Sequence, residues 1–213
     1  IMMANSEAAV VPTGGSIAML GTNPFGIAVP AEKNDIFDLD MATSIVARGK
    51  VVLAQKEGRK IPLGWAVDKN GKETTEPAEV LDGGSMLPFG GAKGYAISLF
   101  IDLMCSCLGG AKNCRTTNHF WTDYEHPQDV GYFMIIIDPS KFLPLRDFTD
   151  KVDAMFDEFK ACPPAPSVKR VFIPGEIEAN KDRTSDKEGI EISDVVANEL
   201  REVGKTYGVE AKF

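Results

Sequence analysis

The stretch from Pro88 to Tyr95, PFGGAKGY, holds the residues best suited to chemistry. Gly90 and Gly91 lead into Lys93, and an apolar run follows from Tyr95 to Leu108. Glycines let the backbone approach a ligand, the first N–H groups of a helix have no partner within it, and lysine adds a positive charge. The string therefore fits a phosphate held at the start of a buried helix, and it fits equally well a plain turn before a helix.

Two familiar phosphate-binding motifs are excluded. A P-loop needs Gly-Lys followed by Ser or Thr, whereas Lys93 is followed by Gly94 and Tyr95. A Rossmann turn needs G-x-G-x-x-G after a strand, and no stretch of the sequence supplies one. A dinucleotide, if one binds, must use another architecture.

The cysteines have the residue types of a metal site but not its spacing. Cys105, Cys107 and Cys114, with His119, could be read as a zinc cluster. However, Cys105 and Cys107 fall inside the expected helix, where residues two apart point about 200° away from each other. We interpret the cysteines as reduced and packed as small hydrophobic residues, as in a cytosolic protein.

Composition narrows the class of protein. The 213 residues suit one large domain or a domain with an appendage, and 44% hydrophobic with 25% charged residues is ordinary for a globular chain. The net charge is −8 and basic residues do not cluster, so we expect no nucleic-acid partner. No apolar run approaches about 18 residues, so we expect no membrane span. We recognise no signal peptide, take cytoplasmic as the default location, and expect a missing upstream segment because the first residue is Ile1.

Hydrophobic periodicity predicts alternating short strands and helices. The predicted strands are residues 1–3, 26–29, 35–40, 131–137 (fully buried) and 171–173. The predicted helices are a segment ending near residue 58, the run 95–108, residues 147–160 and a last helix from about residue 193. Thr43 or Ser44 is expected to cap the first helix, and its expected apolar face is Ile45, Val46, Val52 and Leu53. Asp68–Gly71 predicts a turn, and Gly83–Gly94 is a glycine-rich stretch.

The apolar helix carries one polar stripe. Ser98, Asp102 and Ser106 are four residues apart and therefore share a face. A buried carboxylate must be paired, and a structural hydrogen bond explains Asp102 better than catalysis does. The last helix has an apolar face that requires a packing partner. That face consists of Val196, Leu200, Val203 and Tyr207.

Five strings occur in order and together resemble one family. They are GTNP at 21–24, DMATS at 40–44, IPLGWAVDKNG at 61–71, PFGGAKGY at 88–95 and PGE at 174–176. The chain resembles the malate/L-lactate dehydrogenase family, which is unrelated to the Rossmann dehydrogenases. Its relatives include L-sulfolactate dehydrogenase, ureidoglycolate dehydrogenase and 2,3-diketo-L-gulonate reductase.

The resemblance implies a fold and an assembly. The expected fold class is α/β (α+β), with a non-Rossmann mixed or antiparallel sheet flanked by helices. Residues 1–176 would form the cofactor-binding domain. Residues 177–213 would end in a helix that belongs to a second helical domain and packs on an N-terminal region outside this sequence. Without that region we expect the chain to be unstable alone. The family also implies a homodimer with the active site near the subunit interface.

The resemblance also implies site residues for NAD or NADP. The DMATS segment would approach the ribose and nicotinamide, Lys93 and Gly94 the phosphates or ribose, and the PGE loop another part of the cofactor. Ser6 matches a position near the nicotinamide, and His126 is a candidate at the substrate mouth. The cofactor set is Ser6, Asp40, Met41, Ala42, Thr43, Ser44, Lys93, Gly94, Pro174, Gly175 and Glu176.

No catalytic residue is expected in this chain. The family's general acid/base histidine and its carboxylate-binding arginine lie in the N-terminal region, and His119 and His126 match neither motif. We therefore expect cofactor binding with very little turnover.

Three functions remain open on the sequence. The first is the cofactor-binding part of an NAD(P)-dependent oxidoreductase that interconverts a 2-hydroxy acid and a 2-oxo acid, with malate/oxaloacetate preferred. The alternatives are a non-enzymatic dinucleotide-binding module and a structural subunit that needs another chain for catalysis.

Overall fold

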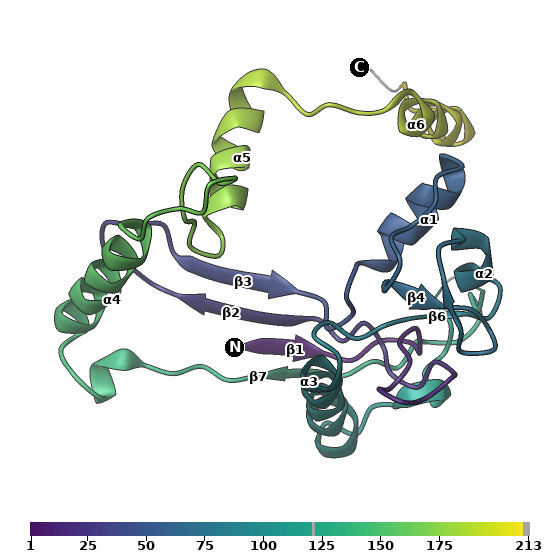
Figure 1. Cartoon of the computed structure of the whole chain (residues 1–213), viewed down its shortest axis with the longest axis horizontal. Helices are drawn as coiled ribbons and strands as arrows, with labels where there is room; N and C mark the ends of the chain where they lie inside the picture. The colour runs from purple at the N-terminus through teal and green to yellow at the C-terminus, as the bar shows by residue number, and fades with distance from the viewer. Residues whose placement is uncertain (121, 211–213) are drawn as a thin grey trace. The chain divides into compact units, whose positions relative to one another are not determined.

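The computed structural model describes residues 1–120 and 122–210 (Figure 1). The chain divides into two compact units, one over residues 1–175 and one that begins at Glu176. In the described part of the chain, no helix combines the length and the apolar character that crossing a bilayer requires.

The larger sheet of the first unit is antiparallel, with the strand order β3-β2-β1-β7. Its strands are β1 (Met2–Ala4), β2 (Phe25–Val29), β3 (Phe37–Met41) and β7 (Tyr132–Met134). Side chains alternate along a strand, so Asp38 and Asp40 share one face and Leu39 and Met41 the other. Met3 is buried against Ile101 and Cys105, which places α3 on one face of this sheet.

A smaller antiparallel sheet holds the main apolar core. Its order is β5 (Glu73–Thr74), β4 (Ala66–Val67), β6 (Ser85–Met86), and α1 (Arg48–Lys56) and α2 (Pro77–Leu81) accompany it. The core residues are Ala9, Val10, Leu20, Val46, Val51, Ala54, Ile61, Ala66, Val80 and Met86. The predicted turn at Asp68–Gly71 joins β4 to β5, and the Asp68 carboxylate accepts the N–H groups of Asn70 (2.8 Å) and Lys72 (2.9 Å).

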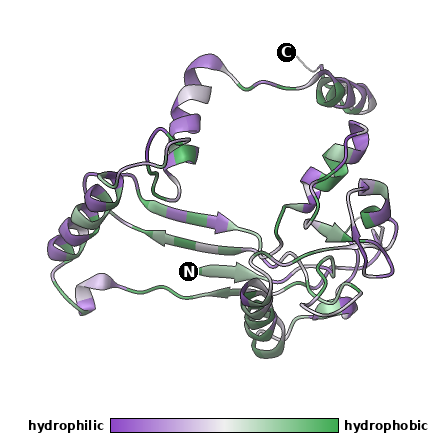
Figure 2. Cartoon of the chain, viewed as in Figure 1, coloured by the Kyte–Doolittle hydropathy of each residue, from purple (hydrophilic) through white to green (hydrophobic). Residues whose placement is uncertain are grey.

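The apolar helix starts earlier than predicted, and the face that it buries is not the one that was expected. α3 (Ala92–Asp102) continues into the π-helical turn η1 (Leu103–Leu108). Its polar stripe is buried, with Ser98 fully covered, whereas apolar side chains such as Phe100 (47% exposed) and Leu103 (48%) face outward. Figure 2 shows the helix coloured hydrophobic along most of its length. The prediction of a buried helix is therefore wrong for this outward face, because the buried face consists of the hydrogen-bonding stripe together with Ile101 and Cys105.

The remaining helices are mostly short or polar. They are η2 (Cys114–Thr116), η3 (Pro139–Lys141), α4 (Leu145–Lys160), α5 (Glu176–Glu188) and α6 (Asp194–Tyr207). Ser193 caps α6 by accepting the Val196 N–H, which confirms the predicted start. The expected apolar face of α6 is 37–78% exposed from Val196 to Tyr207. α5 is rich in charged residues, and the hydrophobic periodicity of the sequence does not predict it.

Three predicted elements need correction. The segment 131–137 is not a fully buried strand: β7 covers only 132–134 at the sheet edge, and Ile136 is 93% exposed. Residues 171–173 form no strand. Thr43 and Ser44 do not cap α1, which follows Ala47, because their hydroxyls donate to the carbonyl groups of other residues. The later start of α1 also turns Val51 and Ala54 inward and leaves Leu53 exposed.

A buried polar network joins the sheet to α3. The Asn23 side chain donates to Asp102 Oδ2 (2.7 Å), Ser98 Oγ (3.1 Å) and the Ser98 carbonyl (3.0 Å). Asn5 donates to Asp102 Oδ1 at 3.5 Å. Burial raises the pKa of Asp102, and the hydrogen bonds from Asn23 and Asn5 oppose that rise. The carboxylate is thus paired structurally, as the sequence reading expected.

A second carboxylate ties α4 to the loop before β3. Asp153 accepts the backbone N–H groups of Glu32 (3.1 Å), Lys33 (3.0 Å) and Asn34 (2.9 Å), and the Asn34 side-chain amide (2.9 Å). Burial alone would raise the pKa of Asp153, but the hydrogen bonds from Asn34, Lys33 and Glu32 lower it to about 2. The ionised form is therefore the one that holds the loop.

Replacing Asn23 tests the buried network. We expect Asn23→Ala to lower the free energy of unfolding by about 2–4 kcal/mol, because Asp102 and Ser98 lose buried partners. Loss of the left-handed preference at this position (φ 31°) accounts for about 1 kcal/mol at most. Urea denaturation measures the effect. Asn198→Ala, at an exposed site, is the control, and equal stabilities of the two variants would contradict the role of the network.

The Asp153 contacts predict a pH dependence. The pKa is lower in the folded chain than the ordinary value near 4, so the stabilisation is complete above about pH 4 and is lost as pH falls through about 2. The difference in Tm between wild type and Asp153→Asn should be constant from pH 7 to 5 and shrink toward pH 2.5. Asp157→Asn, which loses only a 3.3 Å contact to Asn34, should behave like wild type. A pH-independent difference would refute this assignment.

Candidate functional site

The DMATS segment lies between two other motifs that are distant in sequence. The Thr43 N–H donates to the Thr22 carbonyl (2.8 Å), and the Thr43 hydroxyl donates to the carbonyl groups of Thr22 and Asn23 (3.1 Å each). The Thr43 carbonyl in turn accepts the Phe89 N–H (3.1 Å). GTNP, DMATS and PFGGAKGY are therefore joined through the backbone around one fully buried threonine.

Ser6 joins the same cluster. Its hydroxyl accepts the Thr22 N–H (2.9 Å), and its own N–H donates to Asn23 Oδ1 (3.1 Å). A Cβ at Gly21 would collide with Ser6 and with the Asn23 side chain, so only glycine allows this approach. Ser6 is consequently held in place by the GTNP turn.

The start of α3 is open and lacks a side-chain cap. Gly90 (φ 56°) and Gly91 (φ 62°) both adopt left-handed backbone, and a Cβ on either would meet nothing within 4 Å. Gly91 precedes the helix, so no side chain caps its first N–H groups. Lys93 is exposed and makes no hydrogen bond or ion pair with any residue that the structure describes. This helix start therefore offers amides, space and one amine to an anion.

Gly94 has a structural task of its own. A Cβ there would lie 1.8 Å from the Phe89 carbonyl oxygen, so the loop folds back onto the helix only over a glycine. The sequence reading had placed Gly94 beside a cofactor, and the packing alone already requires this residue.

Asp40 and the PGE loop lie at the outer strand of the larger sheet. The Asp38 N–H donates to the Pro174 carbonyl (3.1 Å), and a Cβ on Gly175 (φ 92°) would lie 2.7 Å from Asp38 Cβ. Asp40, exposed, shares a face with Asp38 and pairs across to Gly26. Asp38 and Asp40 also line a cavity of about 480 Å³ over the sheet. Glu176 is the first residue of α5.

The surroundings of the other predicted site residues give less support for a role in binding. Ser44 is buried and its hydroxyl donates to the Val46 carbonyl (2.7 Å), while Met41 and Ala42 are half-buried. His126 lies in an exposed loop with Nδ1 3.1 Å from Asp123 Oδ1, and this hydrogen bond lowers the pKa of Asp123. Within the described residues, no hydrogen bond links His126 to the Ser6 and Thr43 cluster.

The sequence reading gave no role to Thr22 or Asn23, which organise the cluster. The GTNP string was noted as a motif, and its Asn-Pro step is typical of a turn. Only the fold shows that the Asn23 amide reaches Ser98 and Asp102, 75 and 79 residues further along the chain.

The cysteines stay apart in character. Cys105 is buried, but Cys107 and Cys162 are exposed, so the prediction that the cysteines pack as small hydrophobic residues is wrong for these two. Over residues 1–120 and 122–210, no group of three or more His, Cys, Asp or Glu side chains comes together as a set of metal ligands.

Comparison with known proteins identifies the family. A profile described as "Malate/L-lactate dehydrogenase" matches residues 1–201. The chain is 38% identical to malate dehydrogenase of Pyrococcus horikoshii (99% of this chain, 59% of the relative). It is 41% identical to L-sulfolactate dehydrogenase of Methanocaldococcus jannaschii (98% and 59%).

Solved structures agree with these sequence relatives. The sulfolactate dehydrogenase structure from M. jannaschii superposes with a TM-score of 0.82 at 40% identity, over 98% of this chain and 59% of that one. Malate dehydrogenase from Entamoeba histolytica gives 0.89 at 27% identity, over 100% and 63%. The fold class is confirmed as non-Rossmann α/β, with antiparallel sheets flanked by helices. The chain spans about three-fifths of the length of these relatives, and it belongs to the malate/L-lactate dehydrogenase family.

Proposed function

We propose that this chain is the cofactor-binding portion of an NAD- or NADP-dependent dehydrogenase that interconverts a 2-hydroxy acid and a 2-oxo acid. The observation that carries the proposal is the open start of α3, where Gly90, Gly91 and exposed Lys93 stand beside the DMATS segment. Family membership supplies the reaction class, since the named relatives are dehydrogenases of malate, sulfolactate and ureidoglycolate.

The residues present fit a nicotinamide dinucleotide. The pyrophosphate would take the uncapped N–H groups at the start of α3 and the Lys93 amine. Asp40 would accept a hydrogen bond from a ribose hydroxyl, because its carboxylate is exposed. It lies two residues from Asp38, whose N–H donates to the Pro174 carbonyl. The bound nicotinamide would supply hydride transfer to or from the carbon that carries the hydroxyl.

The other residues of the cluster would hold the loops and the cofactor in position and would take no part in the reaction itself. Thr43 holds the backbone of residues 41–44 against the Phe89 loop, and Ser6, fixed by Thr22, would border the nicotinamide. The proton of the substrate hydroxyl needs an acceptor with a pKa near neutral. His119 and His126 are not joined to this cluster in the described residues, so we assign this role to a residue outside the chain.

Malate is our preferred substrate, with oxaloacetate as its 2-oxo partner. The relatives from P. horikoshii and Pyrococcus abyssi are named malate dehydrogenases, which supports the choice. The substrate side chain would be read largely by residues outside this sequence.

We further propose that the enzyme is a homodimer and that α6 packs on a helical domain outside this sequence. The outward apolar side chains of α3 and of the first residue of η1 support the first point, because faces of this kind are common at subunit interfaces. They include Ile97, Leu99, Phe100 and Leu103. The half-exposed apolar face of α6 supports the second.

Lys93→Ala tests the cofactor site. We expect the Kd for NADH or NADPH, measured by fluorescence titration, to rise about tenfold to a hundredfold, as loss of a charged phosphate contact predicts. Comparing the two cofactors also identifies which one the protein prefers.

The matched control is Lys151→Ala, which removes the same charge from an exposed position on α4. Equal Kd values for the Lys93 and Lys151 variants would refute the placement of the phosphates. The activity assay is carried out on a protein that also contains the N-terminal region. Tight cofactor binding without malate-dependent reduction of NAD or NADP would then favour the non-enzymatic binding module.

A further inference from the structure

A second cavity, of about 480 Å³, lies in line with β1, beyond Ile1. Residues 27–30 line it on one side, and residues of the extended segment 135–137 line it on the other. Phe142 and Phe148 add to a lining that is apolar throughout. Figure 1 shows the N-terminus between β2 and the extended trace that leads from β7 to η3. We call this space the slot of the larger sheet.

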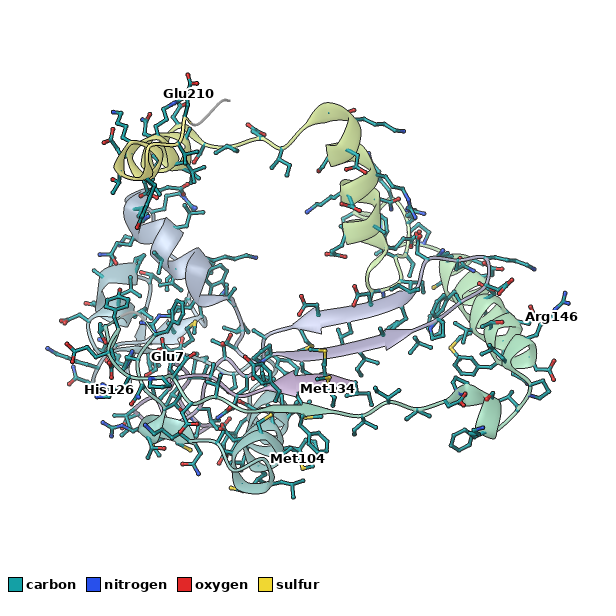
Figure 3. The ribbon with its side chains drawn as sticks, turned by 180° about the vertical axis from the view of Figure 1, so that it is seen from behind. Glu7, Met104, His126, Met134, Arg146 and Glu210 are labelled. Atoms are coloured by element: carbon teal, nitrogen blue, oxygen red, sulfur yellow. The ribbon has the colours of Figure 1, made fainter. Side chains whose placement is uncertain are left out.

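On the β7 side, the pairing with β1 reaches Ile1. The Ile1 amine donates to the Ile135 carbonyl and the Ile135 N–H donates to the Ile1 carbonyl, at 2.9 Å each, one step beyond Met134, which Figure 3 labels. Every second pair of an antiparallel ladder bonds in this way, so the Ile137 N–H also points toward the line of β1. It has no partner among the described residues.

The side chains of this segment alternate as a strand requires. Ile135 and Ile137 line the slot, whereas Ile136 does not line it and is 93% exposed. Ile137 is 58% exposed although it lies beside the slot. The segment therefore has the form of a strand that lacks its inner neighbour.

On the opposite side, β2 extends past β1. Met2 stands opposite Gly26, and by this register no residue of β1 stands opposite Ala28. Ala28 pairs with Asp38 of β3, and the Asp38 N–H points away from β2, to the Pro174 carbonyl (3.1 Å). Ala28 and Asp38 thus form a pair without mutual hydrogen bonds, so the Ala28 N–H points into the slot. Both walls present backbone donors to the same line.

We propose that the slot holds two further residues of β1, supplied by the region of the protein that precedes Ile1. The walls are the two neighbours of one strand, about 9–10 Å apart, which leaves room for a single strand between them. β2 ends at Val29 and Pro30 follows, so the added residues are those opposite Ala28 and Val29. The second residue before Ile1 would share a face with Val29 and Ile137, and we expect it to be apolar and β-branched.

The position of Ile1 favours this occupant over a strand from a second copy. Its amine donates to Ile135 as the peptide N–H of a continuing strand would, so the atom bonded to that nitrogen lies in the slot. A strand from another molecule would compete for the same space. The relatives are longer than the part that this chain matches, 59% in the case of the P. horikoshii enzyme. The continued strand would fix the preceding region relative to Ser6, which follows β1 closely.

Hydrogen exchange at single-residue resolution, on the protein that carries its N-terminal region, tests the proposal. We expect the N–H groups of Ala28 and Ile137 to exchange at least about a hundredfold more slowly than in an unfolded peptide, because both would donate to the added strand. Exchange of either group at the unfolded rate would overturn the proposal. Protection that disappears on dilution would overturn it as well, since the strand would then come from a second copy.

Two proline variants of the same protein give an independent measurement. Ile137→Pro removes an N–H that would bond to the added strand, and Ile136→Pro, the matched control, removes one that points to the outer edge of the sheet, where proline is tolerated. We expect the Tm of the first variant to be roughly 5 °C or more below that of the second. Equal Tm values would show that no strand pairs with Ile137.

Discussion

The buried amide of Asn23 is the contact on which the arrangement of the motifs depends. It donates to Asp102 and Ser98 on α3, while its oxygen accepts the Ser6 N–H. The backbone carbonyl of Asn23 accepts a hydrogen bond from the Thr43 hydroxyl. Each buried polar group that lost its partner here would cost free energy. The hydrogen-bonded residues therefore hold one another in one arrangement. Three segments of the chain, around Ser6, residues 21–24 and residues 40–44, are thereby fixed relative to α3.

This constraint explains why α3 buries its polar stripe. In a helix packed only for apolar burial, Ile97 and Phe100 would face the sheet and Ser98 would face solvent. Here the hydrogen bonds from Asn23 and Asn5 hold Ser98 and Asp102 inward beside the buried Ile101, and Ile97 and Phe100 remain exposed. The same outward apolar character recurs just after β7 and on α6, where Ile136 and Tyr207 are strongly exposed. Exposed apolar faces of this kind are common at protein–protein interfaces.

Local patterns predicted most elements, and they failed where tertiary contacts decide. The alternation at 35–40, the Asn-Gly turn after Asp68 and the start of α6 at Ser193 were all readable, because each follows from local chemistry. The run 131–137 was read as buried because hydrophobicity reports a preference and not the neighbours that satisfy it. Thr43 looked like a helix cap since its type suits one, but its hydroxyl is taken by carbonyl groups some twenty residues earlier. Gly94 was expected at a ligand, and its contact with Phe89 shows a packing requirement that no sequence pattern displays.

The central claim is that the open start of α3 receives the phosphates of a nicotinamide dinucleotide. The most direct measurement is a crystal structure of the protein grown with NADH. The account predicts pyrophosphate oxygens about 3 Å from the backbone N–H groups that follow Gly91 and from Lys93 Nζ. A dinucleotide bound elsewhere, with this helix start in contact only with water, would contradict it.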